Sequence, residues 1–225
     1  MIGFADLAYS LIMSSHATPL GPQATKRDFL SLVTGACAGI GIAAIVWPFI
    51  DSMDPSADVI AAGAPIDVDV SKLAPGQQIV VLWRGAPMLL VHRTPEALKT
   101  LQSPDLVSRL SDPKSGVMQQ PPYAENWHRS AKPDYAVLVG ICTHLGCLPG
   151  YMPNPDPETP EPNWPGGYFC PCHGSKYDLA GRVYKGVPAP YNLPVPPYRF
   201  VNDKTVRIGE NPPGTTFELT SVVQM

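Results

Sequence analysis

The sequence predicts a mainly β protein, with one N-terminal transmembrane helix followed by an antiparallel β domain that carries a loop-rich subdomain. Three observations predict this class. The run from residue 29 to residue 50 contains no charged side chain. Short apolar segments after residue 65 alternate with turn-forming residues. Proline accounts for 28 of the 225 residues, against a usual share of roughly 5%, and it concentrates after residue 120, where it disfavours long helices.

The apolar run is long enough to cross a membrane. As a helix, Phe29 to Ile50 would extend about 33 Å, against a hydrocarbon core of about 30 Å. Two alternatives are a buried core helix and a cleaved signal peptide, whose apolar region is usually shorter. Basic residues precede the run and acidic residues follow it, so the positive-inside tendency places the N-terminus in the cytoplasm. The expected division is a cytoplasmic segment 1–28 and a transmembrane helix 29–50.

The residues around this helix suggest export and a linker. Residues 25–30 read TKRDFL and resemble the twin-arginine export signal, with Lys26 in place of the first arginine. A twin-arginine route would suit a cofactor that is assembled before export. Residues 51–65 have no strong periodicity and are rich in Ala, Asp, Ser and Pro, so we expect a spacer there, or a flexible hinge. The head domain is then expected to occupy residues 66–225.

Local patterns in the head favour short strands. Arg84-Gly85-Ala86 is a turn signal between two apolar segments. Thr94 is a candidate N-cap, with Pro95 at the first position of a short helix that ends near Ser103. The expected strands are 78–83, 87–91, 135–141, 198–201, 205–208 and a closing strand 216–223.

Composition also limits the possible partners. The formal net charge is −3 and no block of Lys and Arg occurs, which excludes a typical nucleic-acid-binding surface. Of five cysteines, Cys37 lies alone in the apolar run, whereas the other four lie in two compact clusters.

Those clusters carry the chemistry. The first box is Cys142-Thr143-His144-Leu145-Gly146-Cys147, and the second is Cys170-Pro171-Cys172-His173-Gly174-Ser175. A structural zinc site needs four ligands and would leave two of the six candidates unused. An all-cysteine [2Fe–2S] cluster would leave both histidines idle. A mixed set of Cys and His ligands leaves no histidine idle and accounts for the cysteines and histidines of both boxes.

The pair of boxes resembles the signature of Rieske proteins of cytochrome bc complexes, and the chain is most similar to the iron–sulfur subunit of bacterial cytochrome bc1 complexes. The resemblance covers the anchor and residues from about 135 to 200. It implies a [2Fe–2S] cluster within a subdomain at about 140–190. Cys142 and Cys170 would bind one iron, and His144 and His173 the other. The remaining Cys147 and Cys172 would form a disulfide, which suits an oxidising compartment.

The resemblance also assigns roles around the cluster. Ser175 and Tyr177 would donate hydrogen bonds to cluster sulfurs and raise the reduction potential. Leu145 would shield the cluster from water. Residues 186–190 resemble the covering proline loop, although Val187 is inserted before Pro-Ala-Pro. We name residues 148–169 the insertion, because the segment is longer than in mitochondrial relatives, and its Pro- and acid-rich sequence predicts an exposed loop.

The function that the resemblance implies is oxidation of ubiquinol within a respiratory complex. The quinol would hydrogen-bond His173 and give one electron to the cluster, while the second electron goes to cytochrome b. The head would then move on its linker and reduce cytochrome c1, contributing to proton translocation. Such a subunit works only within its complex, which is expected to be dimeric. It would sit in the bacterial inner membrane as a single-pass protein with a periplasmic head.

Three other classes of Rieske protein are alternatives to the cytochrome bc1 subunit. Oxygenase-type ferredoxins generally lack the equivalents of Cys147 and Cys172 and also lack an anchor. The anchor and the Pro-Ala-Pro loop disfavour the small subunit of an arsenite oxidase. The longer loop 148–169 and the N-terminal pattern disfavour a chloroplast-type b6f subunit. The histidines outside the boxes, at positions 16, 92 and 128, are assigned no role.

Overall fold

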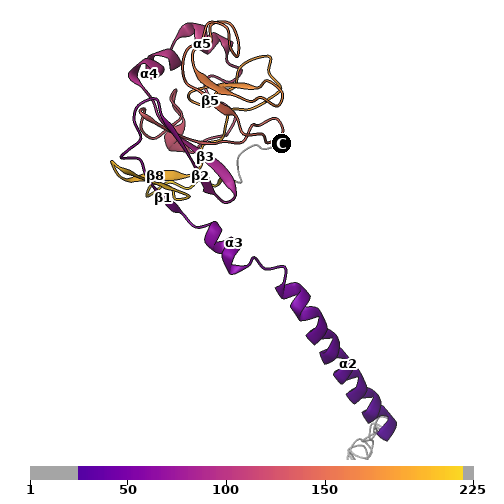
Figure 1. Ribbon diagram of the computed structural model, residues 1–225. Coiled ribbons are helices and arrows are strands. Elements are labelled where there is room, and N and C mark those ends of the chain that lie inside the picture. The colour runs from indigo at the N-terminus through magenta and orange to yellow at the C-terminus, as the bar shows by residue number, and fades with distance from the viewer. Residues whose placement is uncertain (1–24, 220–225) are drawn as a thin grey trace, which may run out of the picture. The chain divides into compact units, whose positions relative to one another are not determined.

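The computed structural model describes residues 25–219, and Figure 1 shows its elements. The chain divides into two compact units, residues 1–55 and 56–225, which are described separately. His16, most of the expected cytoplasmic segment and the end of the expected closing strand lie outside the described residues.

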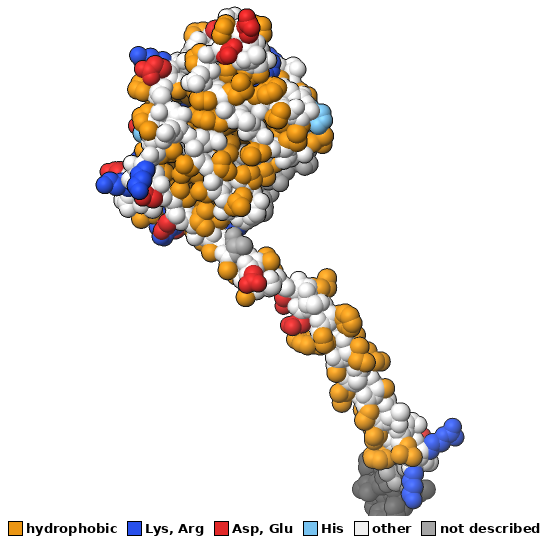
Figure 2. All heavy atoms as spheres, viewed as in Figure 1, with side chains coloured by type: hydrophobic (Ala, Val, Ile, Leu, Met, Phe, Trp, Pro, Cys, Tyr) orange, Lys and Arg blue, Asp and Glu red, His pale blue; other side chains and the backbone are white. Residues whose placement is uncertain are grey.

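The first unit contains helix α2, Lys26–Asp51, which includes the whole predicted transmembrane run. Thr25 caps it: its Oγ1 accepts a hydrogen bond from the Asp28 N–H at 3.2 Å, and its own N–H donates to Asp28 Oδ2 at 2.9 Å. This reciprocal pair satisfies two backbone donors that a helix start leaves open. No side chain of α2 is buried, and hydrophobic side chains cover it (Figure 2). By length and composition the helix can cross a membrane.

The second unit begins with a short helix inside the predicted linker. Helix α3 spans Ala57–Ala62, and Ser56 is its N-cap residue without a side-chain capping bond. The sequence predicts only a spacer or hinge here, because six residues are too few to show helical periodicity. Hydrogen bonds fix the end of this segment: Trp83 Nε1 donates to Ala64 O at 3.0 Å and Arg84 Nε to Gly63 O at 3.4 Å.

Three three-stranded antiparallel sheets build the head. One orders its strands β1 (Ile66–Asp69), β9 (Thr205–Ile208) and β8 (Tyr198–Asn202). A second orders β2 (Gln78–Trp83), β3 (Ala86–His92) and β4 (Tyr135–Val139). The third orders β5 (Gly150–Met152), β6 (Gly167–Phe169) and β7 (Lys176–Asp178). The predicted antiparallel β head is confirmed.

The core lies around the second sheet. Met88, Leu89, Leu90 and Val91 are all buried, as are the four residues that follow Tyr135 in β4. Strands buried on both faces read as continuous apolar runs and not as alternating ones. The hairpin between β2 and β3 has register Trp83↔Ala86, so its turn is one residue shorter than the sequence suggested.

Two short helices contribute to a second, smaller cluster of buried residues, the satellite core, which comprises Leu101, Leu106, Leu110, Trp164, Leu179, Ala180 and Tyr184. Helix α4, Pro95–Leu101, starts as predicted: Thr94 Oγ1 accepts from the Ala97 N–H at 3.1 Å. A second helix, α5 (Pro104–Arg109), follows directly, and a 3-10 turn η1 spans Pro122–Ala124. Helix α4 ends two residues before the predicted Ser103. The second helix was not predicted; Pro104 occupies its first turn, where the missing N–H costs nothing.

The middle of the insertion, residues 153–163, is a largely exposed loop, as the sequence predicted, but its two ends and Trp164 are not. Its two ends form β5 and β6, which pair with each other. Between them, Trp164 is 1% exposed, donates from Nε1 to Met152 O at 3.1 Å and stacks on Tyr184 at 5.7 Å between ring centroids. Glu161 forms ion pairs with Arg109 and Lys176, which come from two other segments. The side chains of Trp164 and Glu161 thus anchor the segment to the head. Its Pro- and acid-rich sequence does not indicate these contacts.

The predicted closing strand is also wrong within the described residues, since 216–219 form no strand. Asn211 Nδ2 donates instead to Phe217 O at 2.8 Å, so a side chain and not a neighbouring strand holds this segment. Two of the histidines without an assigned role have local partners. His92 Nδ1 lies 2.7 Å from Leu73 O, and His128 Nδ1 lies 2.8 Å from Ser130 Oγ.

Candidate metal centre

The first box forms a tight loop at the end of β4. The Cys142 N–H donates to Cys147 O at 2.8 Å, and the Gly146 N–H donates back to Cys142 O at 3.0 Å. Gly146 has φ of +85°, a left-handed conformation that side chains other than glycine rarely adopt. The loop therefore closes on itself and leaves the residues between its ends to project outward.

The second box forms the same loop between β6 and β7. The Cys170 N–H donates to Ser175 O at 2.8 Å, and the Gly174 N–H donates to Cys170 O at 2.9 Å. Gly174 has φ of +76°, so the fifth residue of each box is a left-handed glycine. The two boxes are matched backbone loops, each starting at a buried cysteine.

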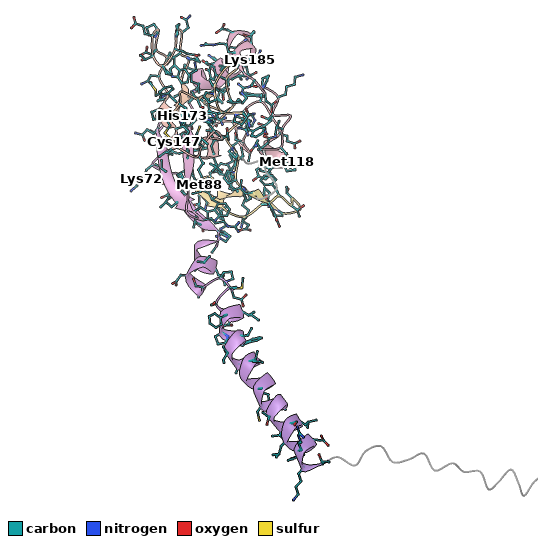
Figure 3. The ribbon with its side chains drawn as sticks, turned by 90° about the vertical axis from the view of Figure 1, so that its right-hand side faces the viewer. Lys72, Met88, Met118, Cys147, His173 and Lys185 are labelled. Carbon is teal, nitrogen blue, oxygen red and sulfur yellow. A yellow bond between two sulfur atoms is a disulfide. The ribbon has the colours of Figure 1, made fainter. Side chains whose placement is uncertain are left out.

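A disulfide between Cys147 and Cys172 joins the boxes, as the sequence predicted. Cys147 and His173 lie on the same part of the head (Figure 3). The sulfur atoms of Cys147, Cys170 and Cys172 lie within 4.8 Å of one another. Those three are not a ligand set, because two of them are oxidised in the disulfide and cannot bind iron as thiolates. The bond brings the free Cys170 close to the first box.

Two free thiols start the loops. Cys142 is 3% exposed and Cys170 is 1% exposed, and neither is in a disulfide. Burial raises the pKa of the Cys142 thiol, but hydrogen bonds from Tyr177, from the His144 backbone and from other neighbours outweigh it and hold that pKa below its usual value. Burial, together with the adjacent Cys142, raises the pKa of Cys170. The hydrogen bonds at Cys142 favour the thiolate that a metal ligand requires, whereas burial and the neighbouring Cys142 favour the neutral thiol at Cys170.

The two histidines of the boxes face each other. The ring centroids of His144 and His173 lie 4.7 Å apart, with an angle of 88° between the ring planes. His144 Nδ1 is buried and has no hydrogen-bond partner within residues 25–219. An unpartnered buried nitrogen is costly unless something binds it. With both thiols free nearby, this nitrogen fits a metal-bound imidazole, so the residues present suit an iron–sulfur cluster.

Tyr177 contacts the first box with its hydroxyl. The oxygen lies 3.3 Å from Cys142 Sγ and accepts from the Thr143 N–H at 3.1 Å. Thr143 Oγ1 lies 3.2 Å from the same hydroxyl and donates to Tyr191 O at 2.7 Å. Sequence analysis missed Thr143, although its position between two proposed ligands was a usable signal. Tyr177 is placed beside a sulfur, where the resemblance put it.

Ser175 closes the second box and contacts the first. It is buried, and its hydroxyl hydrogen-bonds the Cys142 thiol. Ser175 Oγ also accepts from the Ala189 N–H at 3.1 Å. This bond attaches the proline loop to the second box, so Val187 does not prevent the loop from packing there. Leu145 is 68% exposed at the tip of the first box, and its shielding of a cluster stays a prediction.

Comparisons with known proteins agree with this architecture. Residues 110–198 match the family described as Rieske [2Fe-2S] domain, and residues 17–56 match Ubiquitinol-cytochrome C reductase Fe-S subunit TAT signal. The iron–sulfur subunit of ubiquinol-cytochrome c reductase from Allochromatium vinosum is 49% identical over 85% of this chain and 91% of its own length. The same subunit from Bradyrhizobium diazoefficiens is 48% identical over 82% of this chain and 94% of its own.

Among solved structures, a hyperthermophilic respiratory Complex III chain is similar, with 25% identity and a TM-score of 0.42 over 78% of this chain and 98% of that chain. The match over residues 17–56, together with the apolar helix α2, identifies α2 as a single-pass membrane anchor. The identities to the curated relatives extend over most of both chains. The chain belongs to the family of Rieske [2Fe–2S] iron–sulfur subunits of ubiquinol-cytochrome c reductase.

Proposed function

We propose that Cys142 and Cys170 bind one iron of a [2Fe–2S] cluster and that His144 and His173 bind the other. The observation that carries the proposal is the meeting of two matched loops, in which the disulfide occupies two cysteines and leaves two buried thiols free. The facing imidazoles and the unpartnered His144 Nδ1 support the histidine half of the set.

The protein serves in this proposal as the electron-accepting subunit for ubiquinol oxidation, and it passes the electron to cytochrome c1. When bound, the cluster supplies a one-electron acceptor whose neutral imidazole ligands raise its potential above that of an all-thiolate cluster. His173 is exposed, so its imidazole is available to hydrogen-bond a quinol hydroxyl. Tyr177 and Ser175 hydrogen-bond the Cys142 sulfur, which favours extra negative charge there.

The anchor and linker place the head beside its partners. Lys26 and Arg27 precede the apolar run, which supports a cytoplasmic N-terminus and a periplasmic head in a bacterial inner membrane. Of the predicted linker 51–65, the part between α2 and α3, residues 52–56, then acts as the hinge between anchor and head, because α3 is helical and Gly63 and Ala64 are bonded to the head. The partners in the proposed dimeric complex are cytochrome b, which holds the quinol site, and cytochrome c1. The alternative, a role as a diffusing ferredoxin, has no use for a membrane anchor.

A redox titration monitored by electron paramagnetic resonance tests the function. The full-length chain is purified with its cluster and titrated at several pH values. We expect a high-potential [2Fe–2S] signal whose midpoint falls as the pH rises, since electron uptake is then coupled to proton uptake. A low potential that does not depend on pH would rule out the quinol mechanism and leave a ferredoxin role.

The ligand set has a separate test. Histidine is labelled with nitrogen-15, and the nuclei coupled to the reduced cluster are counted by pulsed paramagnetic resonance. We expect two coupled imidazole nitrogens in the wild type, and the same two in the control His128→Asn, which alters a histidine outside both boxes. Coupling to one nitrogen or none would contradict the assignment of His144 and His173.

A further inference from the structure

The end of helix α3 is bonded to the hairpin between β2 and β3. Trp83 Nε1 donates to Ala64 O at 3.0 Å, and Arg84 Nε donates to Gly63 O at 3.4 Å. Gly63 directly follows α3, and its own N–H bonds back to the last turn of the helix. The two bonds from the hairpin therefore attach the C-terminal end of α3 to the head.

Helix α3 has little other support. Its six residues are far fewer than the roughly 12–15 that an isolated helix needs to be even marginally stable in water. Its largest side chains, Val59 and Ile60, are 62% and 64% exposed, so they bury little apolar surface. Ser56 makes no side-chain capping bond at its start. The helix thus depends on the groups that are bonded at its end.

The core holds the indole of Trp83, which is 2% exposed. Its ring lies against the backbone of Gly209, where a Cβ would be 2.8 Å from the ring atom Cζ2. Gly209 has φ of +94°, and its N–H donates to Pro197 O at 2.7 Å. Glycine both adopts this backbone conformation and leaves room for the ring. The donor that reaches Ala64 O is therefore fixed by its surroundings.

Arg84 has an uncommon backbone conformation. Its φ is +52°, in the left-handed region, and Gly85 follows with φ of +74°. The two residues form the turn between Trp83 and Ala86, a kind of turn that favours Asn or Asp at its first position. The arginine there lays its guanidinium over the Trp83 ring, 4.6 Å from the centroid, and bonds Gly63 O. A residue held in a costly conformation suggests that its contacts have a role.

The two donors act together. They are consecutive residues, they bond consecutive carbonyls, and the guanidinium of one lies on the ring of the other. Arg84 also supplies a cation where α3 ends, a favourable place for positive charge, and the helix has no basic residue of its own. We name Trp83 and Arg84 the latch.

We propose that the latch fixes the length of the hinge. While it is closed, the hinge comprises residues 52–56, because α3 and the residues up to Ala64 are held on the head. When it opens, α3 loses its support and the hinge extends over residues 52–64. Trp83 and Arg84 are thus positioning residues, since a longer flexible connection lowers the effective concentration of the head at each partner. The inference rests on the proposed function, in which the head carries electrons from the quinol site to cytochrome c1.

Hydrogen exchange of the full-length protein with its cluster, in detergent, tests the latch itself. Trp83→Phe keeps an aromatic ring in the core and removes the bond to Ala64 O. The amides of Ile60 and Gly63, which are bonded within the α3 segment, report on the helix. They should exchange about fivefold faster in the variant, the equivalent of one hydrogen bond.

Two single variants accompany this measurement. Arg84→Met removes the longer and more exposed bond and should speed the same amides by about twofold. Trp127→Phe makes the same change as Trp83→Phe at a ring that packs edge-on against His128, and it should leave the exchange of α3 unchanged.

Electron transfer in the assembled complex tests the consequence. Membranes that contain the whole complex are mixed rapidly with quinol, and reduction of cytochrome c1 is followed in the wild type and in the double variant of Trp83→Phe with Arg84→Met. The double variant should be slower by about twofold to fourfold, because effective concentration falls roughly as the −3/2 power of the length of a flexible connection. The midpoint potential of the cluster should keep its wild-type value.

Each measurement can overturn the proposal. Unchanged exchange of α3 in Trp83→Phe would show that the latch does not hold the helix. Faster exchange with a wild-type rate in the double variant would show that the bonds are structural only, and a shifted midpoint potential would place the effect at the metal centre. If the wild type did not reduce cytochrome c1, the proposed function would fail and the positioning role with it, whereas hydrogen exchange would still show whether the latch holds α3.

Discussion

The two boxes share one backbone loop and differ in what they attach to it. Each begins with a buried free cysteine and has a left-handed glycine at its fifth position. The first box carries its histidine third and a disulfide cysteine sixth, whereas the second carries a disulfide cysteine third and its histidine fourth. The sixth position of the second box, Ser175, instead hydrogen-bonds across to the first box.

This difference shows how two copies of one loop form an asymmetric site. His144 is partly buried, with its Nδ1 enclosed, whereas His173 is exposed. One imidazole is thus partly enclosed by the protein and the other is open to solvent. The hydrogen bonds to sulfur are also uneven, since Tyr177 and Ser175 both act on Cys142.

The largest expected effect comes from the position at which the boxes are the same. Cys142→Ala and Cys170→Ala should each abolish cluster binding, because each removes one of only two free thiols in the boxes. Iron and acid-labile sulfide content, measured on the purified protein, checks this. Cys37→Ala, which alters the free cysteine of α2, is the control and should retain the full cluster. A cluster that survives either box substitution would show that the two thiols are not equivalent ligands.

Removing the link between the boxes should have the next largest effect. The disulfide spans 25 residues of sequence, and replacing both Cys147 and Cys172 by Ala should lower the stability of the cluster region by about 3 kcal/mol. Thermal loss of the visible absorbance of the cluster measures the change. Wild-type thermal stability in the double variant would mean that the hydrogen bonds of Ser175 and Tyr177 hold the loops together without it.

The uneven hydrogen bonding predicts a shift in potential. Tyr177→Phe and Ser175→Ala should each lower the midpoint potential by about 20–60 mV, the equivalent of one hydrogen bond in a one-electron couple. Protein-film voltammetry measures it. Tyr184→Phe makes the same chemical change at a buried tyrosine of the satellite core and should leave the potential unchanged. An equal fall in the Tyr184 variant would mean that general loosening, and not the bond to sulfur, sets the potential.

The smallest expected effect is a loss of stability when the glycine at the fifth position of either box is replaced. Gly146→Ala and Gly174→Ala should each destabilise the protein by about 1 kcal/mol, because a Cβ is strained at positive φ. An added Cβ would meet no atom within 4 Å at either site, so strain should be the whole cost. Thermal melting of the two variants checks this. Clearly unequal losses would show that the loops are less alike than their hydrogen bonds indicate.

The sequence correctly predicts those parts of the molecule whose structure depends on neighbouring residues. The anchor, the hairpin at Arg84 and Gly85, and the cap at Thr94 each follow from neighbouring residues, and the structure contains all three. The disulfide was also predicted correctly, through the resemblance of the two boxes to a known pattern.

The errors lie where distant residues decide the structure. Nothing near Trp164 in the sequence shows that it will stack on Tyr184, and nothing near Glu161 shows that it will pair with Arg109 and Lys176. The sequence therefore predicts the loop of the insertion but not the residues that anchor it to the head. The contacts of Thr143 with Tyr177 and Tyr191, 34 and 48 residues away, could not be predicted for the same reason, although its position in the first box was a usable signal.

The N-cap of α2 places two demands on one short stretch. Thr25 and Asp28 hold the first turn of the helix, and both lie within the residues that resemble an export signal. Two requirements limit sequence change there. The capping residues must start the helix, and the export machinery must recognise the motif. A substitution at Asp28 alone would alter both the helix cap and the motif, so the two effects could not be separated. Thr25→Ser keeps the cap and changes only the motif. Among related sequences, changes at Thr25 and at Asp28 are thus expected to occur together and not at one position alone.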